Sequence, residues 1–168
     1  MTCKVEKTNV MRLLEQKKVP YLAHEYDPDT TDGQLVARAL GQDPARVFKT
    51  LVTEAGDRSH WVFVIPVDRS LNLKKAARAA GVKALSMLKQ KELLPLTGYV
   101  HGGCSPLGMK KALPTFFEES FAQPSAVCVS AGRRGKQVEL APRALLELCR
   151  GRLADLCDPQ PLPPPEQG

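Results

Sequence analysis

Apolar side chains recur along the chain with two different spacings, and these spacings predict its helices and strands. Near the N-terminus, apolar residues at helical spacing follow Thr8 and Asn9, which are helix-capping residue types, and stop before Pro20. On the same grounds, helices are predicted over residues 10–18, 34–40, 73–80 and 142–150, with short helical turns after Pro44 and over 89–94. β-rich runs predict strands over residues 21–26, 48–53, 60–67, 82–85, 99–100, 126–130 and 137–140.

Turn residues indicate how the strands pair. The Glu54–Asp57 segment joins strands 48–53 and 60–67 into a hairpin at the centre of the sheet, and strands 126–130 and 137–140 form a second hairpin. Helices and strands alternate, and no internal repeat is present. The pattern therefore predicts an α/β fold of the mixed α+β kind, a single domain with a largely antiparallel central sheet flanked by helices.

The length of 168 residues suits one domain with its own core. We place that domain at residues 1–157. Residues 158–168 form a proline-rich tail, which we expect to be extended or disordered because it is too rich in proline to pack.

Composition narrows the class of protein. With 43% hydrophobic and 25% charged residues, the chain resembles a soluble globular protein and not a disordered or fibrous one. The longest apolar stretch, Trp61–Val67, contains Pro66 and is far shorter than the ~20 residues of a spanning helix. Because the N-terminus also lacks a basic-then-apolar signal pattern, we expect a cytoplasmic protein that has no membrane partner.

The net charge of +6 indicates either an anionic partner such as nucleic acid or a solvated basic surface. The last eleven residues carry two acidic residues and no basic one, so the positive charge lies in the predicted domain.

The spacing of the cysteines and histidines argues against a disulfide framework and against a metal site. The five cysteines are an odd number without a CxxC pair, and the three histidines are isolated from one another in the sequence. We expect free thiols. A nucleophilic Cys104 would need a nearby base, and His101 lies three residues before it in the sequence. Two residues in one short loop need not face each other, however, and no third group that would orient them is evident.

Three segments could carry chemistry. Lys49 follows Phe48 in a strand, where it is either a solvated lysine or a cation at the floor of a pocket. The loop at 101–108 has paired glycines that could present N–H groups to an oxyanion, or it is simply a tight turn. The loop at 130–135 places two arginines at a hairpin tip, to bind phosphates or to solubilise the turn. Tyr26, which ends a strand, is either a core aromatic or a site residue.

These segments, in this order, resemble the YbaK/ProX family of trans-editing aminoacyl-tRNA deacylases, which are freestanding relatives of the editing domain inserted in bacterial prolyl-tRNA synthetases. The resemblance covers residues 8 to 157. The segments that carry it are Leu13-Leu14-Glu15, His24-Glu25-Tyr26, Val47–Leu51, Leu73–Ala76, Thr97–Gly108, Lys110-Lys111, Val129–Gly135 and Val138–Leu140.

The resemblance implies the fold of that editing domain and the release of a wrongly attached amino acid from tRNA, most similarly cysteine from tRNA(Pro). It implies aminoacyl-tRNA and prolyl-tRNA synthetase as partners, and neither DNA nor a cofactor. Two alternatives stay open: removal of alanine or serine, and a non-catalytic module that binds tRNA or a synthetase.

Site residues follow from these motifs. The residues expected to act in catalysis are Lys49 and Tyr26. Those expected to bind substrate are Thr50, Gly102, Gly103, Ser105, Ser130 and Gly132. Those expected to contact tRNA phosphates are Lys74, Lys75, Lys110, Lys111, Arg133 and Arg134.

The chain departs from the family pattern at two positions. Gln137 stands where the hairpin of the family typically has an aspartate, and Cys104 stands where it has an apolar residue. Both departures concern which amino acid is removed more than they concern the fold.

Overall fold

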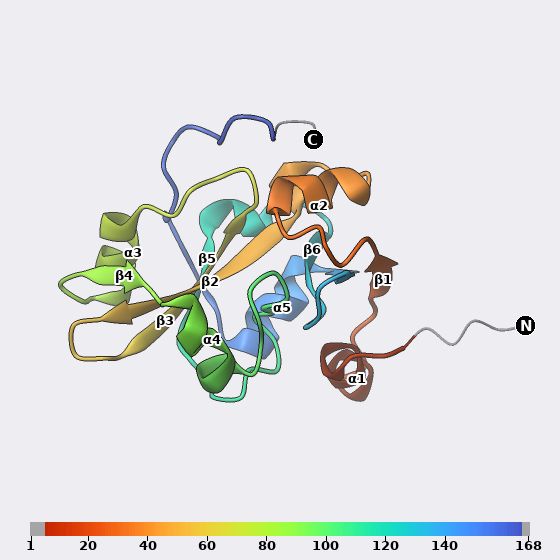
Figure 1. Ribbon diagram of the computed structural model, residues 1–168, viewed down its shortest axis with the longest axis horizontal. Coiled ribbons are helices and arrows are strands. Elements are labelled where there is room, and N and C mark those ends of the chain that lie inside the picture. The colour runs from red at the N-terminus through yellow and green to blue at the C-terminus, as the bar shows by residue number, and fades with distance from the viewer. Residues whose placement is uncertain (1–5, 166–168) are drawn as a thin grey trace, which may run out of the picture.

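Two β-sheets and five α-helices make up the part of the chain that the computed structural model describes, residues 6–165 (Figure 1). The helices are α1 (Asn9–Gln16), α2 (Gly33–Ala39), α3 (Leu73–Ala80), α4 (Gln90–Thr97) and α5 (Pro142–Cys149), and 3₁₀ turns lie at η1 (Pro44–Arg46) and η2 (Glu119–Ala122). The strands are β1 (Leu22–Glu25), β2 (Phe48–Ala55), β3 (His60–Pro66), β4 (Leu85–Met87), β5 (Thr115–Glu118), β6 (Val127–Ser130), β7 (Lys136–Leu140) and β8 (Arg152–Ala154).

The larger sheet has five strands in the order β4-β2-β3-β5-β8. The β2–β3 hairpin lies at its centre, as the sequence predicts, and β4 pairs antiparallel with β2. β5 and β8 join the sheet in parallel, because each is reached through a long connection that includes at least one helix. The smaller sheet, β1-β7-β6, is entirely antiparallel and contains the second predicted hairpin. The predicted mixed α/β single domain is confirmed.

Capping residues set the helix ends where the pattern places them. The Thr8 hydroxyl accepts a hydrogen bond from the backbone N–H of Met11 at 3.2 Å and begins α1. The Asn72 side chain accepts one from Lys75 N–H at 3.0 Å and begins α3. α3 ends at Gly81, whose φ of +72° is a left-handed conformation that favours glycine.

Four short elements differ from the prediction. The strand expected at 82–85 lies at Leu85–Met87. Residues 99–100 form no strand, because Gly98 is left-handed and Tyr99 N–H bonds to the Thr97 hydroxyl, which turns the chain. β5 and β8 were not predicted, since each has only three or four residues and no alternating pattern.

Two large cores stabilise the fold, one on each face of the larger sheet, and a smaller third cluster consists of Ala37, Val47, Val67 and Cys128. The first lies between the two sheets and includes buried side chains of α1 and α5, such as Leu14 and Leu145. The second lies between the larger sheet and α3, with Phe63 and Ile65 facing Ala76. A parallel bridge between Val47 and Cys128 brings the start of β2 beside β6.

The proline-rich tail is extended but held against the body in the part that the structure describes, residues 158–165. Asp158 N–H donates to the Ser70 carbonyl at 3.1 Å, and Leu162 N–H donates to the Asp68 carbonyl at 2.6 Å. The expectation that the tail does not pack is therefore wrong for these residues. Proline lacks an N–H, but Asp158, which precedes the first proline of the tail, and Leu162, which lies between two prolines, supply the donors. Residues 166–168 and Cys3 lie outside the described part of the chain.

Among the described residues, none of the helices has the length and the apolar character that crossing a bilayer would require.

Candidate active site

A cavity of about 150 Å³ lies where the start of β2, the end of β1, the 101–105 loop and the smaller sheet meet. Five of the residues expected from the sequence to form a site line it: Tyr26, Lys49, Thr50, Gly102 and Ser130. The motifs that were separate in the sequence thus converge on one hollow.

Strand pairing explains how the sheet residues meet. Val47, just before β2, bridges Cys128 of β6 in parallel, and Lys49 and Ser130 lie two residues further along the chain from each. Ser130 in turn lies directly across from Gln137 of β7. Because side chains two residues apart share a face of a strand, the cavity wall continues across these strands.

Lys49 supplies the positive charge of the cavity. Its neighbour Phe48 is 2% exposed and packs edge-on against Phe121, so the two successive side chains have opposite environments. Burial lowers the pKa of Lys49 below its ordinary value, and the carboxylates of Asp32 and Asp68 partly oppose that shift. This half-buried position, and not a solvated strand face, is where the structure places the ammonium group.

Two polar atoms in the cavity wall lack partners. Thr50 Oγ1 and Gln137 Oε1 are buried, and neither forms a hydrogen bond within residues 6–165. A buried polar group without a partner costs about 1–3 kcal/mol. A ligand that offers donors to these atoms would remove that cost, so the cavity suits a polar ligand.

The glycine loop approaches other segments too closely for side chains. Gly102 has φ +86°, and a Cβ there would lie 3.1 Å from Thr31 Cγ2 and 3.2 Å from Arg134 Nε. A Cβ on Gly103 would lie 3.0 Å from the backbone nitrogen of Arg134. The paired glycines therefore allow the 101–105 loop to pack on the 130–135 loop, with Gly102 left facing the cavity.

Three expected substrate-binding residues do not line the cavity: Gly103, Ser105 and Gly132. Ser105 is fully buried, and its hydroxyl accepts a hydrogen bond from Leu107 N–H at 3.2 Å. Gly132 N–H donates to the Ser130 hydroxyl at 3.1 Å. The hydrogen bonds of these three residues are local to their own loops, so their roles are structural.

Tyr26 reaches the cavity from the end of β1. Its backbone N–H donates to the Gly135 carbonyl at 2.9 Å, which fixes it to the hairpin loop. The structure also adds wall residues that no motif indicated, among them Val36 of α2 and Leu93 of α4. These are apolar residues in helices, and a local sequence pattern cannot distinguish them from core residues.

The expected tRNA-binding residues divide into two groups. Lys74 and Lys75 lie on α3, at the opposite end of the molecule's long axis from α1 (Figure 1). Lys75 is also bonded to Asp155 at 3.1 Å and to the Cys157 carbonyl at 2.9 Å.

The other group lies in the two loops beside the cavity. Lys110 and Lys111 are exposed and form no ion pair within the described chain. Arg133 pairs with Glu6 at 2.8 Å, and Arg134 Nε donates to the His101 carbonyl at 2.8 Å.

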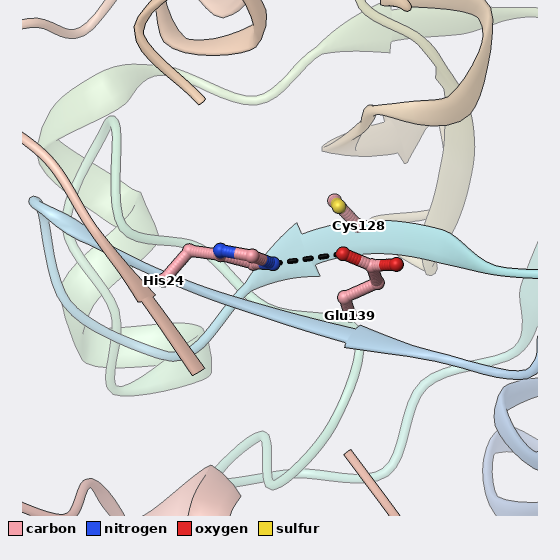
Figure 2. Close-up of side chains that lie close together, drawn as sticks. All are labelled: His24, Cys128 and Glu139. Atoms are coloured by element: carbon pink, nitrogen blue, oxygen red, sulfur yellow. Dashed lines mark hydrogen bonds and ion pairs between the residues drawn. The ribbon is translucent and has the colours of Figure 1, made fainter. Parts of the chain in front are cut away.

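A cluster of His24, Cys128 and Glu139 lies on the smaller sheet, beside the cavity wall (Figure 2). These are metal-ligand residue types that the fold brings together from distant positions. Glu139 Oε1, however, accepts hydrogen bonds from His24 Nε2 at 2.8 Å and from Gln42 Nε2 at 3.3 Å. Its Oε2 lies 3.9 Å from the Arg46 guanidinium, which would repel a cation. Hydrogen bonds account for this cluster, and we assign no metal to it.

Cys104 lines the cavity as a protonated thiol. Burial raises its pKa to about 12, so almost no thiolate exists at neutral pH. We expect iodoacetamide at pH 7 to alkylate Cys104 at least about a hundredfold more slowly than cysteine in a small peptide. Mass spectrometry of the folded and the urea-unfolded protein measures this, and rapid labelling of folded Cys104 would contradict it.

The chain is similar in sequence to two known proteins, and this similarity agrees with the family resemblance of its motifs. A protein of Enterococcus faecalis, EbsC, named as a candidate Cys-tRNA(Pro)/Cys-tRNA(Cys) deacylase, is 48% identical over 153 residues, which cover 90% of this chain and 93% of that protein. The YwhH protein of Bacillus subtilis is 25% identical over 134 residues, covering 79% and 85%.

Two solved structures share the fold. A candidate trans-editing enzyme for prolyl-tRNA synthetase is 24% identical with a TM-score of 0.79, and the match covers 91% of this chain and 99% of that one. The hypothetical protein APE2540 is 24% identical with a TM-score of 0.81, covering 89% and 99%. The family model of the aminoacyl-tRNA editing domain matches residues 27–148, which include every cavity residue except Tyr26, so the chain belongs to the aminoacyl-tRNA editing domain family.

Proposed function

We propose that this protein is a freestanding deacylase that removes cysteine wrongly attached to tRNA(Pro). The observation that carries the proposal is the cavity itself, in which a half-buried Lys49 lies beside Gly102 and the partnerless Thr50 hydroxyl. Family membership and the name of the E. faecalis relative support the same substrate class.

The cavity residues stabilise charge on the reacting ester. An aminoacyl ester is already activated, so holding its carbonyl in place contributes much of the catalysis. The Lys49 ammonium lies where it can bind the ester oxygen or the terminal ribose. The backbone N–H of Gly102 forms no hydrogen bond within the described chain and can donate to the developing oxyanion. Ser130, Thr50 and Tyr26 complete the polar wall.

The substrate supplies the nucleophile. The cysteine thiol loses its proton and attacks the carbonyl carbon of its own ester, so that a C–S bond forms. The C–O bond to the ribose then breaks, and the ribose oxygen takes a proton. Water afterwards opens the cyclic thioester. The protonated state of Cys104 agrees with this scheme, because no protein thiolate is needed.

A panel of mischarged tRNAs separates the proposal from its alternatives. The uncharged Gln137 in the cavity wall, where the family typically has an aspartate, makes alanine and serine the substrates to compare. We expect purified protein to release cysteine from tRNA(Pro) faster than alanine or serine. Fastest release of alanine or serine would reassign the substrate, and tRNA binding without any release would indicate a non-catalytic module.

We propose that tRNA phosphates meet the basic residues beside the cavity, in the cytoplasm where charged tRNA leaves prolyl-tRNA synthetase. Lys110 lies five residues after the 101–105 loop, and its N–H donates to the carbonyl of Thr97, the last residue of α4, at 2.8 Å. Replacing Lys110 and Lys111 together with alanine should lower the log–log salt slope of tRNA binding by about one to two.

Lys83→Ala is the control for this measurement, because it removes one exposed lysine that is not expected to contact tRNA. An unchanged slope in the Lys110 and Lys111 double variant, measured by filter binding between low and physiological salt, would remove this loop from the docking surface.

A further inference from the structure

Two adjacent arginines of the hairpin loop make different contacts. Arg133 points outward to the carboxylate of Glu6, 2.8 Å away. Arg134 instead turns toward the cavity loop, where its Nε donates to the carbonyl oxygen of His101 at 2.8 Å. His101 and Gly102 both line the cavity, so Arg134 bonds to the backbone of the cavity wall itself.

The bond to His101 fixes the direction of the next N–H. The described chain has no cis peptide bond. In a planar trans peptide, the carbonyl oxygen and the following N–H point to opposite sides. Because the His101 carbonyl faces Arg134, the Gly102 N–H points away from Arg134, and it has no acceptor within residues 6–165.

The glycines cannot hold this peptide by themselves. Glycine adopts positive and negative φ about equally well, so the 101–102 peptide could rotate if nothing restrained it. The loop's own restraint is the hydrogen bond from Gly103 N–H to the Val100 carbonyl at 3.0 Å, one peptide further along. Close packing of Gly102 and Gly103 on Arg134 adds contact but no bond to the 101–102 peptide.

We propose that Arg134 is a positioning residue that orients the His101–Gly102 peptide and keeps the Gly102 N–H available to the ester oxygen. The inference rests on the proposed function, in which this N–H stabilises the oxyanion. It differs from a tRNA phosphate contact, because Arg134 then acts on the chemical step even when the substrate has no tRNA body.

The kinetic test uses a substrate without a tRNA body, the 3′ cysteinyl ester of adenosine. We expect Arg134→Ala to lower kcat for this ester by about ten- to a hundredfold with little change in KM. This is less than the roughly 10²–10³-fold cost of losing an oxyanion donor outright, because Arg134 orients the donor and is not itself the donor. Arg143→Ala on α5 is the control, because it removes an exposed guanidinium that pairs, within the described chain, only with Glu147, and it should keep kcat within about twofold. Arg134→Lys, which retains one donor, should recover part of the loss. Normal cleavage of the ester by folded Arg134→Ala would overturn the proposal.

A second measurement is independent of activity. In ¹⁵N–¹H spectra, the Gly102 amide resonance should shift in Arg134→Ala and stay in place in the control Arg143→Ala. An unmoved Gly102 resonance in Arg134→Ala overturns the positioning role whatever the kinetics show. Failure of the wild-type protein to cleave any aminoacyl ester would instead refute the proposed function, while a shifted resonance would still support the peptide orientation.

Discussion

Replacing Lys49 with alanine is expected to lower the rate of cysteine release from tRNA(Pro) by about a hundredfold or more, with the fold intact. That is the usual scale for losing one preorganised electrostatic contact in a site that excludes water. Folding should tolerate the change, because burial already disfavours the Lys49 ammonium and lowers its pKa. Single-turnover release of labelled cysteine measures the rate, and circular dichroism and the melting temperature report the fold.

Arginine should not replace Lys49. Its planar guanidinium is larger than the ammonium and needs a fork of acceptors, whereas the cavity holds about 150 Å³ and surrounds a point charge. Lys83→Ala provides the matched control, since it removes the same charge from an exposed position with no proposed role. Near-normal turnover by well-folded Lys49→Ala would contradict the role of the lysine.

The pKa shift adds a pH dependence to the Lys49 prediction. Because burial lowers the Lys49 pKa, the ammonium loses its proton at a lower pH than an exposed lysine would. Wild-type activity should therefore decline as the pH rises through that lowered pKa, and this alkaline decline should be absent from the residual activity of Lys49→Ala. An identical alkaline limb in both proteins would assign the decline to another group.

Serine-charged tRNA(Pro) should be deacylated at least about a hundredfold more slowly than cysteine-charged tRNA(Pro). The two substrates differ only in the atom that would attack the ester. A cysteine thiol is partly ionised and strongly nucleophilic near neutral pH, whereas a serine hydroxyl is a poor nucleophile without an activating base. The cavity offers no thiolate of its own to compensate, because burial holds Cys104 protonated.

Parallel single-turnover reactions with the two charged tRNAs, corrected for spontaneous hydrolysis in buffer, measure this ratio. Equal rates would show that water or a protein group attacks the ester, and would contradict the substrate-thiol mechanism. An aminoacyl thioester trapped on Cys104 and detected by mass spectrometry would contradict it as well.

The parts of the fold that the sequence predicted depend on local interactions. Thr8 and Asn72 cap α1 and α3 through hydrogen bonds that span three residues, and the β2–β3 hairpin joins neighbouring segments of the chain. β5 and β8 escaped prediction because long connections bring them in parallel beside β3 and β5. Only the assembled sheet defines such short strands.

In the site, too, the features that could be predicted lie within local sequence motifs, and the others depend on contacts between distant segments. Lys49, Thr50 and Gly102 belong to motifs that the sequence displays, and each lines the cavity. The missing partners of Thr50 Oγ1 and Gln137 Oε1 depend on what surrounds them in space, so no sequence pattern reports them.

The different contacts of Arg133 and Arg134 could not be predicted from the sequence. Because they are neighbours in a basic loop, the sequence predicts that Arg133 and Arg134 bind phosphates together. The fold places Glu6 against Arg133 and the His101 carbonyl against Arg134, and these partners lie 127 and 33 residues away along the chain. The two arginines therefore differ in their contact partners, which are distant in the sequence, and not in residue type.

The central claim is that this cavity releases cysteine from tRNA(Pro). The most direct test is a single-turnover reaction in which wild-type protein, in excess, meets tRNA(Pro) charged with labelled cysteine. Release at least about a hundredfold faster than in buffer, with correctly charged prolyl-tRNA(Pro) left intact, is the predicted result. A rate equal to that in buffer, or equal release of proline, would contradict the account.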